Sequence, residues 1–447
     1  MNTKRQHIIQ FVCIMAILIA IAWQGLAHVV KTKPLNGAIT NARPVEFNFQ
    51  TYLDGSYQDW LTEHAKLNTG FREFFIRNYN QVVFSCFNKI TNDNVVMGFN
   101  KELFLKMYLE EITGKRLLQF YPSVEAAKAD ARNNVEATLK LIDTLQQHGT
   151  SFLFVFAPSK TSTYPEYMPL TYQEHVSDFS LEEYYIQLFK EAGIPFIDFH
   201  NYFKSIKDDY PYPLYTRTGT HWSEATMPMV ADSLLRKLEE VSGCRFPRIK
   251  LDDLNFSADY SAQDGELEGQ LNLLFPLQKP ALPQPLFTLQ DTVGKDRPRI
   301  LVIADSYFVQ LSHSCFVDAF SRWDYWKYNR EVVSSDNRIN FKEVQWLPEA
   351  PRILEDADIV LAMFTAPCFY SYMYGFANSA LELYEQNSND NERNIQLIIK
   401  EISSNPDWTR AVERQAKELG LSFEENLVRN AIYVNKVRNE QAKEQKQ

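Results

Sequence analysis

Glycine, paired cysteines and excess positive charge are all scarce in this chain of 447 residues. The 15 glycines form no glycine-rich loop after a predicted strand, which argues against a nucleotide-binding enzyme. Because the sequence has no H-E-x-x-H motif and no C-x-x-C pair, we expect neither a metal site nor another cofactor. The formal net charge of −10 gives no electrostatic reason to bind nucleic acid.

The cysteines are too widely spaced to predict a disulfide framework. One of them falls in an apolar run near the N-terminus, which leaves four that could pair in three ways. The lack of any short pair favours free or buried thiols instead. The five positions are Cys13, Cys86, Cys244, Cys315 and Cys368.

A long uncharged run near the N-terminus predicts a membrane anchor. It extends from Ile8 to Val30, which is long enough to cross a bilayer as a helix. Trp23 and Leu26 crowd the only candidate cleavage region, near Ala27, so an uncleaved anchor is favoured over a removed signal peptide. Basic residues flank the run on both sides, so charge alone does not set its orientation. Since a first anchor usually exports a large domain that follows it, we expect a single-pass protein of the inner membrane whose soluble domain lies in the periplasm or outside the cell.

Residues 1–33 are thus expected to be a cytoplasmic stub and a transmembrane anchor, and residues 34–122 a helical lead-in region. Within the lead-in region, Gly70–Asn80 mixes apolar and basic residues at helical spacing, which predicts a helix. Val95–Gly98 is typical of a short strand followed by a turn.

Amphipathic helices and short apolar strands alternate in the next part of the chain. Apolar residues at intervals of three and four predict a helix over 123–149, and Phe152–Ala157 predicts a buried strand. The capping box Ser180–Glu183 opens a second helix, which precedes a short strand at Pro195–Phe199. This alternation predicts an α/β domain over residues 123–390, with a parallel sheet flanked by helices.

Residues 244–298 interrupt that rhythm. A third helix is predicted from about 226 to 241, and the proline-rich stretch after it is interpreted as an insertion with little regular structure. Residues 391–447 are expected to be a C-terminal helical region. Between these two parts we predict a strand, a helix and a strand, at Arg299–Ala304, Tyr307–Phe320 and Asp358–Phe364.

A serine directly after a predicted strand is the candidate nucleophile. Ligands of open α/β sheets bind at the carboxyl ends of the strands, where Ser306 falls. The free N–H groups of the helix that begins there favour a developing oxyanion, although a purely structural N-cap serine would occupy the same position. His221 lies in the polar loop 215–223 before another helix, either as a general base or as a histidine bonded only to backbone.

The context of these two residues resembles the AlgX/AlgJ-type alginate O-acetyltransferases of the SGNH hydrolase superfamily. Asp305-Ser306 follows a strand, and Thr220–Ser223, which contains the histidine, precedes it in the same order as in that family. The resemblance covers roughly residues 50–385. Three further stretches also resemble that family, at Gly70–Arg72, Val96–Gly98 and Pro158–Glu166.

The resemblance implies a fold, a reaction and a partner. The fold would be SGNH-hydrolase-like, with a flavodoxin-like parallel sheet. Ser306, deprotonated by His221, would carry an acetyl group as a covalent ester and pass it to a hydroxyl of an exported polysaccharide. In related systems a polytopic membrane acyltransferase supplies the acetyl group, and such a protein would be the partner here.

The chain departs from the family at the acid of the triad. The family has an aspartate two residues before the histidine, where this chain has Gly219. Because that acid orients the imidazole, either Asp198 or Asp305 replaces it, or a Ser–His dyad suffices, or catalysis is lost. The Gly-x-Asn-Asp oxyanion block is also missing, so the second oxyanion donor is not predicted. Lys160 and Trp222 are the candidate substrate-binding residues, although Lys160 could equally be a solvated surface lysine.

Two functions therefore remain open. The first is an acyltransferase or carbohydrate acetylesterase with a serine nucleophile. The second is a catalytically impaired protein that binds glycan or acts as a scaffold in a polysaccharide modification and export complex. The missing triad acid favours the second, and the joint presence of the serine and histidine motifs favours the first.

Overall fold

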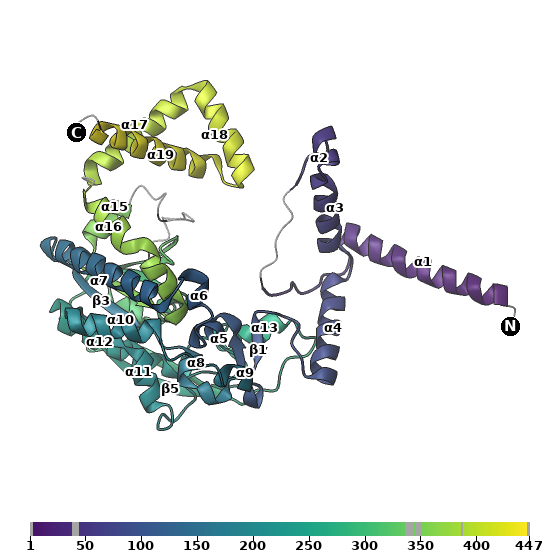
Figure 1. Ribbon diagram of the computed structural model, residues 1–447, viewed down its shortest axis with the longest axis horizontal. Coiled ribbons are helices and arrows are strands. Elements are labelled where there is room, and N and C mark those ends of the chain that lie inside the picture. The colour runs from purple at the N-terminus through teal and green to yellow at the C-terminus, as the bar shows by residue number, and fades with distance from the viewer. Residues whose placement is uncertain (1–2, 38–43, 336–343, 345–349, 386–387, 445–447) are drawn as a thin grey trace. The chain divides into compact units, whose positions relative to one another are not determined.

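The computed structural model describes residues 3–37, 44–335, 344, 350–385 and 388–444 (Figure 1). Contacts within the chain define two compact units. Unit 1 comprises Met1–Lys106, Arg217–Thr220 and Gly265–Pro280. Unit 2 comprises Met107–Thr216, His221–Asp264 and Ala281–Gln447.

Unit 1 begins with α1, Thr3–Ala27, which is long and apolar enough to cross a membrane, in agreement with the sequence. Its C-terminal end packs tightly against the turn before α4, since a Cβ on Gly70 would overlap the carbonyl oxygen of Ile21. A Cβ on Gly25 would likewise overlap the carbonyl oxygen of Asn68. Only glycine allows two backbones to approach so closely, so these positions fix the start of α4 against the end of α1.

The rest of unit 1 combines helices with a small hairpin. The predicted strand at residue 95 is β1, which pairs antiparallel with β2, and α13 from the proline-rich stretch packs on both. Buried Val95, Leu103 and Leu267 form the centre of this contact. The elements are α2 Phe49–Leu53, α3 Ser56–Leu67, α4 Arg72–Phe87, β1 Val95–Met97, β2 Leu103–Leu105 and α13 Glu266–Leu271.

Unit 2 contains a six-stranded sheet in the order β4-β3-β10-β7-β8-β9. Five strands are parallel and the edge strand β9 is antiparallel to β8, so the predicted parallel α/β sheet is confirmed. β8 and β9 were not predicted. The strands are β3 Ser151–Phe156, β4 Phe196–Asp198, β7 Arg299–Ala304, β8 Arg322–Lys327, β9 Glu331–Ser334 and β10 Ile359–Phe364.

Helices cover both faces of this sheet. α7 and α10 pack with α16 on one face, around a core that includes Phe154 and Phe156. α12 packs against β3 on the other face. The cap predicted at Ser180 forms, since its side chain accepts a hydrogen bond from the first turn of α10. Ser123 caps α7 in the same way, and left-handed Gly193 ends α10. These helices are α7 Val124–Gln147, α10 Leu181–Ala192, α12 Met227–Ser242 and α16 Phe376–Glu385.

The prediction of little regular structure in residues 244–298 is wrong. β5, Arg248–Ser257, and β6, Leu282–Gln290, form a long antiparallel pair. Pro283 and Pro285 lie on β6 two residues apart, so their missing N–H groups fall on the same side of the strand. A two-stranded sheet leaves one side of each strand unpaired, which explains how this strand tolerates both prolines.

Several shorter helices connect these elements, and the predicted helix over 307–320 is shorter than expected. It is replaced by α14, Phe308–Ser312, and a separate 3₁₀ turn at Cys315–Ala319. The predicted C-terminal helical region forms α17, α18 and α19 around a cluster of its own. The remaining bounds are α5 Lys106–Ile112, α6 Leu117–Phe120, α8 Lys160–Thr163, α9 Leu170–Gln173, α11 Phe199–Ile206, α15 Ala350–Asp356, α17 Ser388–Ser404, α18 Pro406–Leu419 and α19 Phe423–Glu444.

Candidate active site

Ser306 lies at the carboxyl edge of the parallel sheet. β7, which ends at Ala304, is flanked by β10 and β8, and Asp305-Ser306 follow it directly. Ser306 is half-buried, so its hydroxyl is held by its surroundings while remaining accessible. This is the edge of an open α/β sheet at which ligands bind.

His221 meets this serine. Its Nε2 atom lies 2.8 Å from the Ser306 Oγ atom, which is hydrogen-bonding distance. The imidazole is largely buried, with 6% of the residue exposed, and its ring packs on Tyr307 at a centroid distance of 4.7 Å. A neutral imidazole in this position can accept the proton of the serine hydroxyl.

The loop that carries His221 is fixed at both ends. An antiparallel bridge joins Tyr215 to Trp222, and the Ser223 N–H donates to the Leu214 carbonyl at 2.8 Å. Gln310 on α14 donates from Nε2 to the Trp222 carbonyl at 3.1 Å. Because α14 follows the serine directly, this bond ties the histidine loop to the segment that carries the nucleophile.

Lys160 and Trp222, the predicted substrate-binding residues, are both buried. Lys160 is 2% exposed, and its ammonium donates to the Thr216 carbonyl at 2.7 Å. Trp222 is fully buried and packs on Phe199 and Tyr307. Neither side chain is open to a ligand here, so both support the histidine loop from within the domain. Lys160 is not the solvated lysine that the sequence also allowed.

Asp305, a predicted substitute for the triad acid, is engaged in structural hydrogen bonds. Its Oδ2 atom accepts hydrogen bonds from the N–H and the hydroxyl of Thr365, at 2.8 and 2.7 Å. Its Oδ1 atom accepts from the Tyr307 N–H at 3.0 Å, and the Cys368 thiol donates to Oδ2. The carboxylate therefore ties the end of β7 to the end of β10 and holds the serine turn.

Asp198 is also engaged elsewhere. It is the last residue of β4, which β3 and β10 separate from β7. Its carboxylate caps α11, accepting from the N–H of Asn201 at 2.8 Å and from the Asn201 side chain at 2.9 Å. The two substitutes predicted for the family's aspartate, at whose position this chain has Gly219, are thus both occupied in structural hydrogen bonds.

Tyr328 is a site residue that the sequence did not indicate. Its hydroxyl lies near Ser306, whose hydroxyl and backbone N–H act to lower the Tyr328 pKa. It lies in the tight turn between β8 and β9 with a left-handed φ of 54°, an uncommon backbone conformation for a bulky residue. Burial raises the pKa of Tyr328 to about 12, so the hydroxyl keeps its proton at neutral pH. Because β8 was not predicted, the turn that follows it was not predicted either.

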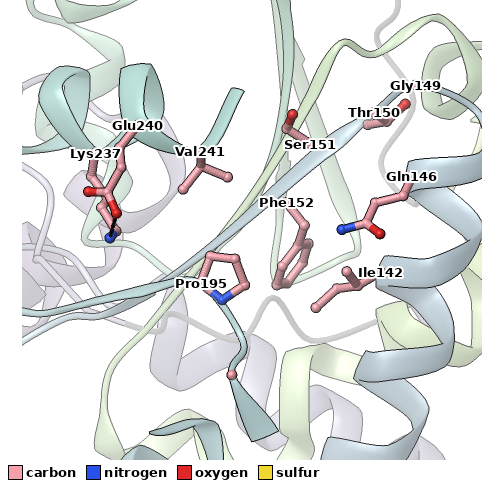
Figure 2. Close-up of a pocket in the computed structure, with 11 residues that line it drawn as sticks. Ile142, Gln146, Gly149, Thr150, Ser151, Phe152, Pro195, Lys237, Glu240 and Val241 are labelled. Carbon is pink, nitrogen blue, oxygen red and sulfur yellow. Dashed lines mark hydrogen bonds and ion pairs between the residues drawn. The ribbon is translucent and has the colours of Figure 1, made fainter. Parts of the chain in front are cut away.

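A cavity of about 600 Å³ lies at the opposite end of β3 (Figure 2). It is bordered by Thr150, Ser151 and Phe152 at the amino end of that strand, and by the last turns of α7 and α12. Lys237 and Glu240 form an ion pair of 2.7 Å on its wall. Since Ser306 follows the carboxyl end of a parallel strand, this cavity belongs to the other edge of the sheet and not to the candidate active site.

The fold and the family comparison together define the class of this domain. Residues 118–299 match the family described as "SGNH hydrolase-like domain, acetyltransferase AlgX". Over these residues the predicted resemblance to the AlgX/AlgJ-like O-acetyltransferases is confirmed. The match includes His221 and ends at the first residue of β7, before Ser306. No protein of curated function matches the sequence.

Three solved structures are similar at low identity. The O-acetyltransferase domain of Pseudomonas putida AlgJ is 15% identical, with a TM-score of 0.40, over 64% of this chain and 99% of that one. Pseudomonas aeruginosa AlgX is 14% identical, with a TM-score of 0.40, over 64% of this chain and 67% of that one. Bacillus cereus PatB1 is 10% identical, with a TM-score of 0.35, over 55% of this chain and 92% of that one.

Proposed function

We propose that this protein is an extracytoplasmic O-acetyltransferase that modifies hydroxyls of an exported polysaccharide through an acetyl ester on Ser306. The observation that carries the proposal is the 2.8 Å contact between His221 Nε2 and Ser306 Oγ at the carboxyl edge of the sheet. The match of residues 118–299 to an acetyltransferase family supports the choice of acyl transfer over other reactions of a Ser–His pair.

The reaction has two half-steps. In the first, His221 takes the proton from the Ser306 hydroxyl while Oγ attacks the acetyl carbonyl carbon of the donor. The bond from that carbon to the donor then breaks, and the leaving group receives the proton from the imidazolium. In the second half-step, His221 deprotonates a sugar hydroxyl, which attacks the acetyl carbon and releases Ser306 with its proton restored.

Tyr328 and the backbone of Ser306 are the proposed oxyanion donors. Each tetrahedral intermediate places a negative charge on the former carbonyl oxygen, next to the Ser306 N–H. The Tyr328 hydroxyl lies close to that same N–H and is protonated at neutral pH. It is therefore placed to donate the second hydrogen bond, which the missing Gly-x-Asn-Asp block would otherwise supply.

The orientation of His221 has visible support even with glycine at position 219. The imidazole packs on Tyr307, and its loop is closed by the Tyr215–Trp222 bridge and tied to α14 through Gln310. We infer that these contacts contribute to the alignment that the family's aspartate provides. Packing that restricts a ring to one orientation lowers the entropy cost of reaching the reactive geometry.

The location and the partner follow from the N-terminal helix. α1 would anchor the protein in the inner membrane, with the domain in the periplasm or outside the cell. Acetyl groups originate in the cytoplasm in related systems, so a polytopic membrane acyltransferase would deliver them across the bilayer to Ser306.

Trapping the acyl-enzyme tests this function. The full chain, incubated with a chromogenic acetyl ester, should release product and carry one acetyl group on the Ser306 peptide in mass spectrometry. Ser306→Ala should abolish both signals. Ser312→Ala is the matched control, because this hydroxyl lies on α14 and bonds only to local helix groups. Equal turnover in the Ser306→Ala protein would refute the proposal.

A glycan-binding or scaffold role is the second candidate, and Gly219 is the observation that favours it. In that case Ser306→Ala and His221→Ala would both retain binding to the polysaccharide, and neither they nor the parent chain would release acetyl.

Transfer and hydrolysis differ in the acceptor, so a chain that acetylates an added oligosaccharide is a transferase and one that only releases acetate is an esterase.

A further inference from the structure

Helix α4 carries one face that packs on the rest of unit 1. The contacting positions are spaced by four, three and four residues, so they share one side of the helix. Arg77, for example, donates to the Pro34 carbonyl at 2.7 Å, just beyond the end of α1. The positions are Glu73, Arg77, Asn80 and Phe84, and their respective partners are Thr32, Pro34, Leu271 and the β1–β2 cluster.

The opposite face of α4 is apolar and exposed. Phe75, Tyr79, Val82 and Cys86 repeat the same spacing two residues later, which at 3.6 residues per turn places them on the far side of the helix. Phe75, Tyr79 and Val82 are 50%, 65% and 54% exposed. We call these four residues the outer stripe. Soluble helices carry polar side chains on such a face, so the outer stripe is suited to an apolar environment.

The position of α4 relative to α1 indicates which environment this is. Gly25 and Gly70 bring the end of α1 into backbone contact with the turn before α4. α3 and α4 continue one another and run across the end of α1 (Figure 1). A helix that spans a bilayer as α1 can would therefore place α4 along the membrane surface.

We propose that the outer stripe of α4 lies in the headgroup boundary of the bilayer that α1 crosses. The proposal rests on α1 spanning a membrane and goes beyond acetyl transfer. The outer stripe combines two aromatic residues with an aliphatic one, the composition of helices that lie at this boundary. Exposed Phe47, Phe49 and Tyr52 around α2 extend the apolar surface of the same unit. The membrane would thus hold unit 1 at two places, across the bilayer and along its surface.

The outer stripe has no charge, which predicts how it depends on lipid. An interfacial helix that binds through basic residues needs anionic lipid, whereas one that buries aromatic side chains does not. We therefore expect the contact in vesicles of pure phosphatidylcholine, with no further gain when phosphatidylglycerol is added.

Two natural cysteines make the test direct. Cys86 lies on the outer stripe and Cys13 in α1, and both are exposed. Single-cysteine chains, with the other cysteines changed to serine, carry an environment-sensitive fluorophore in phosphatidylcholine vesicles that contain nitroxide lipids. Lys140→Cys, at an exposed position of α7, is the control. Nitroxides near the headgroup should quench the Cys86 label about twofold, deep nitroxides should quench the Cys13 label, and the control label should be unaffected.

Several outcomes would overturn the proposal. One is an unquenched Cys86 label beside a quenched Cys13 label, and another is quenching only in anionic vesicles. A Cys86 label that is shielded only when another membrane protein is co-reconstituted would identify the stripe as a protein interface instead. The combined change Tyr79→Glu and Val82→Glu should abolish Cys86 quenching while Cys13 stays quenched. Ser306→Ala should leave every signal unchanged, so failure of the catalytic proposal would not be mistaken for failure of this one.

Discussion

Two histidines of unit 2 are almost equally buried but have opposite kinds of partner. His221, in the loop beside β7, faces the neutral hydroxyl of Ser306 at 2.8 Å. His200, on α11 after β4, faces two carboxylates, with Nδ1 2.7 Å from Glu182 and Nε2 3.0 Å from Glu183. Burial acts to lower the pKa of His200, but the two carboxylates outweigh it and raise the pKa to about 9.

The difference shows how a histidine side chain can act as a base at one position, His221, and as a structural cation at another, His200. A cation between two carboxylates has no free lone pair to accept a proton, so His200 joins α10 to α11 and cannot act as a base. An imidazole beside a hydroxyl can accept a proton and return it. The hydrogen-bonding partner of each histidine therefore distinguishes the catalytic role from the structural one, whereas the degree of burial does not.

The largest expected effect comes from His221→Ala. We expect acetyl-ester turnover to fall by roughly 10²- to 10⁴-fold, because His221 Nε2 lies 2.8 Å from the hydroxyl whose proton it would accept. The thermal unfolding midpoint should change little, since the imidazole bridges two segments already tied through Gln310. Steady-state kinetics and a thermal melt on the same sample test the two expectations. A variant that loses stability as well as turnover would contradict a purely catalytic role for His221.

His200→Ala should show the reverse pattern. Removing one partner of a buried ion pair leaves Glu182, which is 1% exposed, without its cation, at a cost of about 3–5 kcal/mol in unfolding free energy. Turnover per folded molecule should stay within a few-fold of the parent. His175→Ala, at an exposed histidine on the surface, is the control and should cost less than about 0.5 kcal/mol. Denaturant titration measures the difference, and equal stability of the two variants would contradict the structural role.

Tyr328→Phe tests the proposed oxyanion donor beside Ser306. It removes one oxyanion donor and keeps the ring, so we expect roughly a 10²-fold loss in kcat with little change in stability. The measurement is the kcat of acetyl-ester cleavage at saturating ester. Tyr374→Phe, which removes the hydroxyl of a neighbouring ring, is the control because that hydroxyl bonds to Cys368 and not to Ser306. Similar losses in both variants would argue for a packing effect.

The sequence predicted the parts of this comparison that depend on local pattern. Apolar periodicity and caps located α7, α10, β3 and β7, and the order of strand, serine and upstream histidine loop indicated the family. β8 was missed because Arg322–Lys327 mixes charged and aromatic residues, and the buried carboxylate of Asp324 is compensated by Arg322, which pairs with it at 2.8 Å. Such compensation depends on a contact that a pattern of single residues does not show.

The roles of the acidic residues could not be predicted for the same reason. Asp305 is adjacent to the nucleophile in sequence, yet its carboxylate bonds to Thr365, which follows a different strand. His200 has no motif around it, and its partners lie on α10, which precedes it by a strand. Tyr328 depends on the β8–β9 turn, and that turn exists only once both strands are in place. Each of these assignments needs the register of the sheet, which the local sequence does not contain.

The smallest expected effect is a pH dependence of stability that comes from His200. In the folded state its pKa is about 9, above the value of 6.5 that an exposed histidine has. Folding therefore favours the protonated form, and the stabilisation is complete below pH 6.5 and lost as the pH rises through 9. Glu183 adds an opposite trend at acid pH, because its hydrogen bond with His200 lowers its pKa and its contribution disappears as the carboxylate is protonated.

The thermal midpoint of the full chain should accordingly fall between pH 6.5 and 9, and His200→Gln should flatten that decline, because glutamine does not titrate. The parent chain, measured in the same buffers, is the control. A decline that persists in His200→Gln would mean that another group titrates on unfolding.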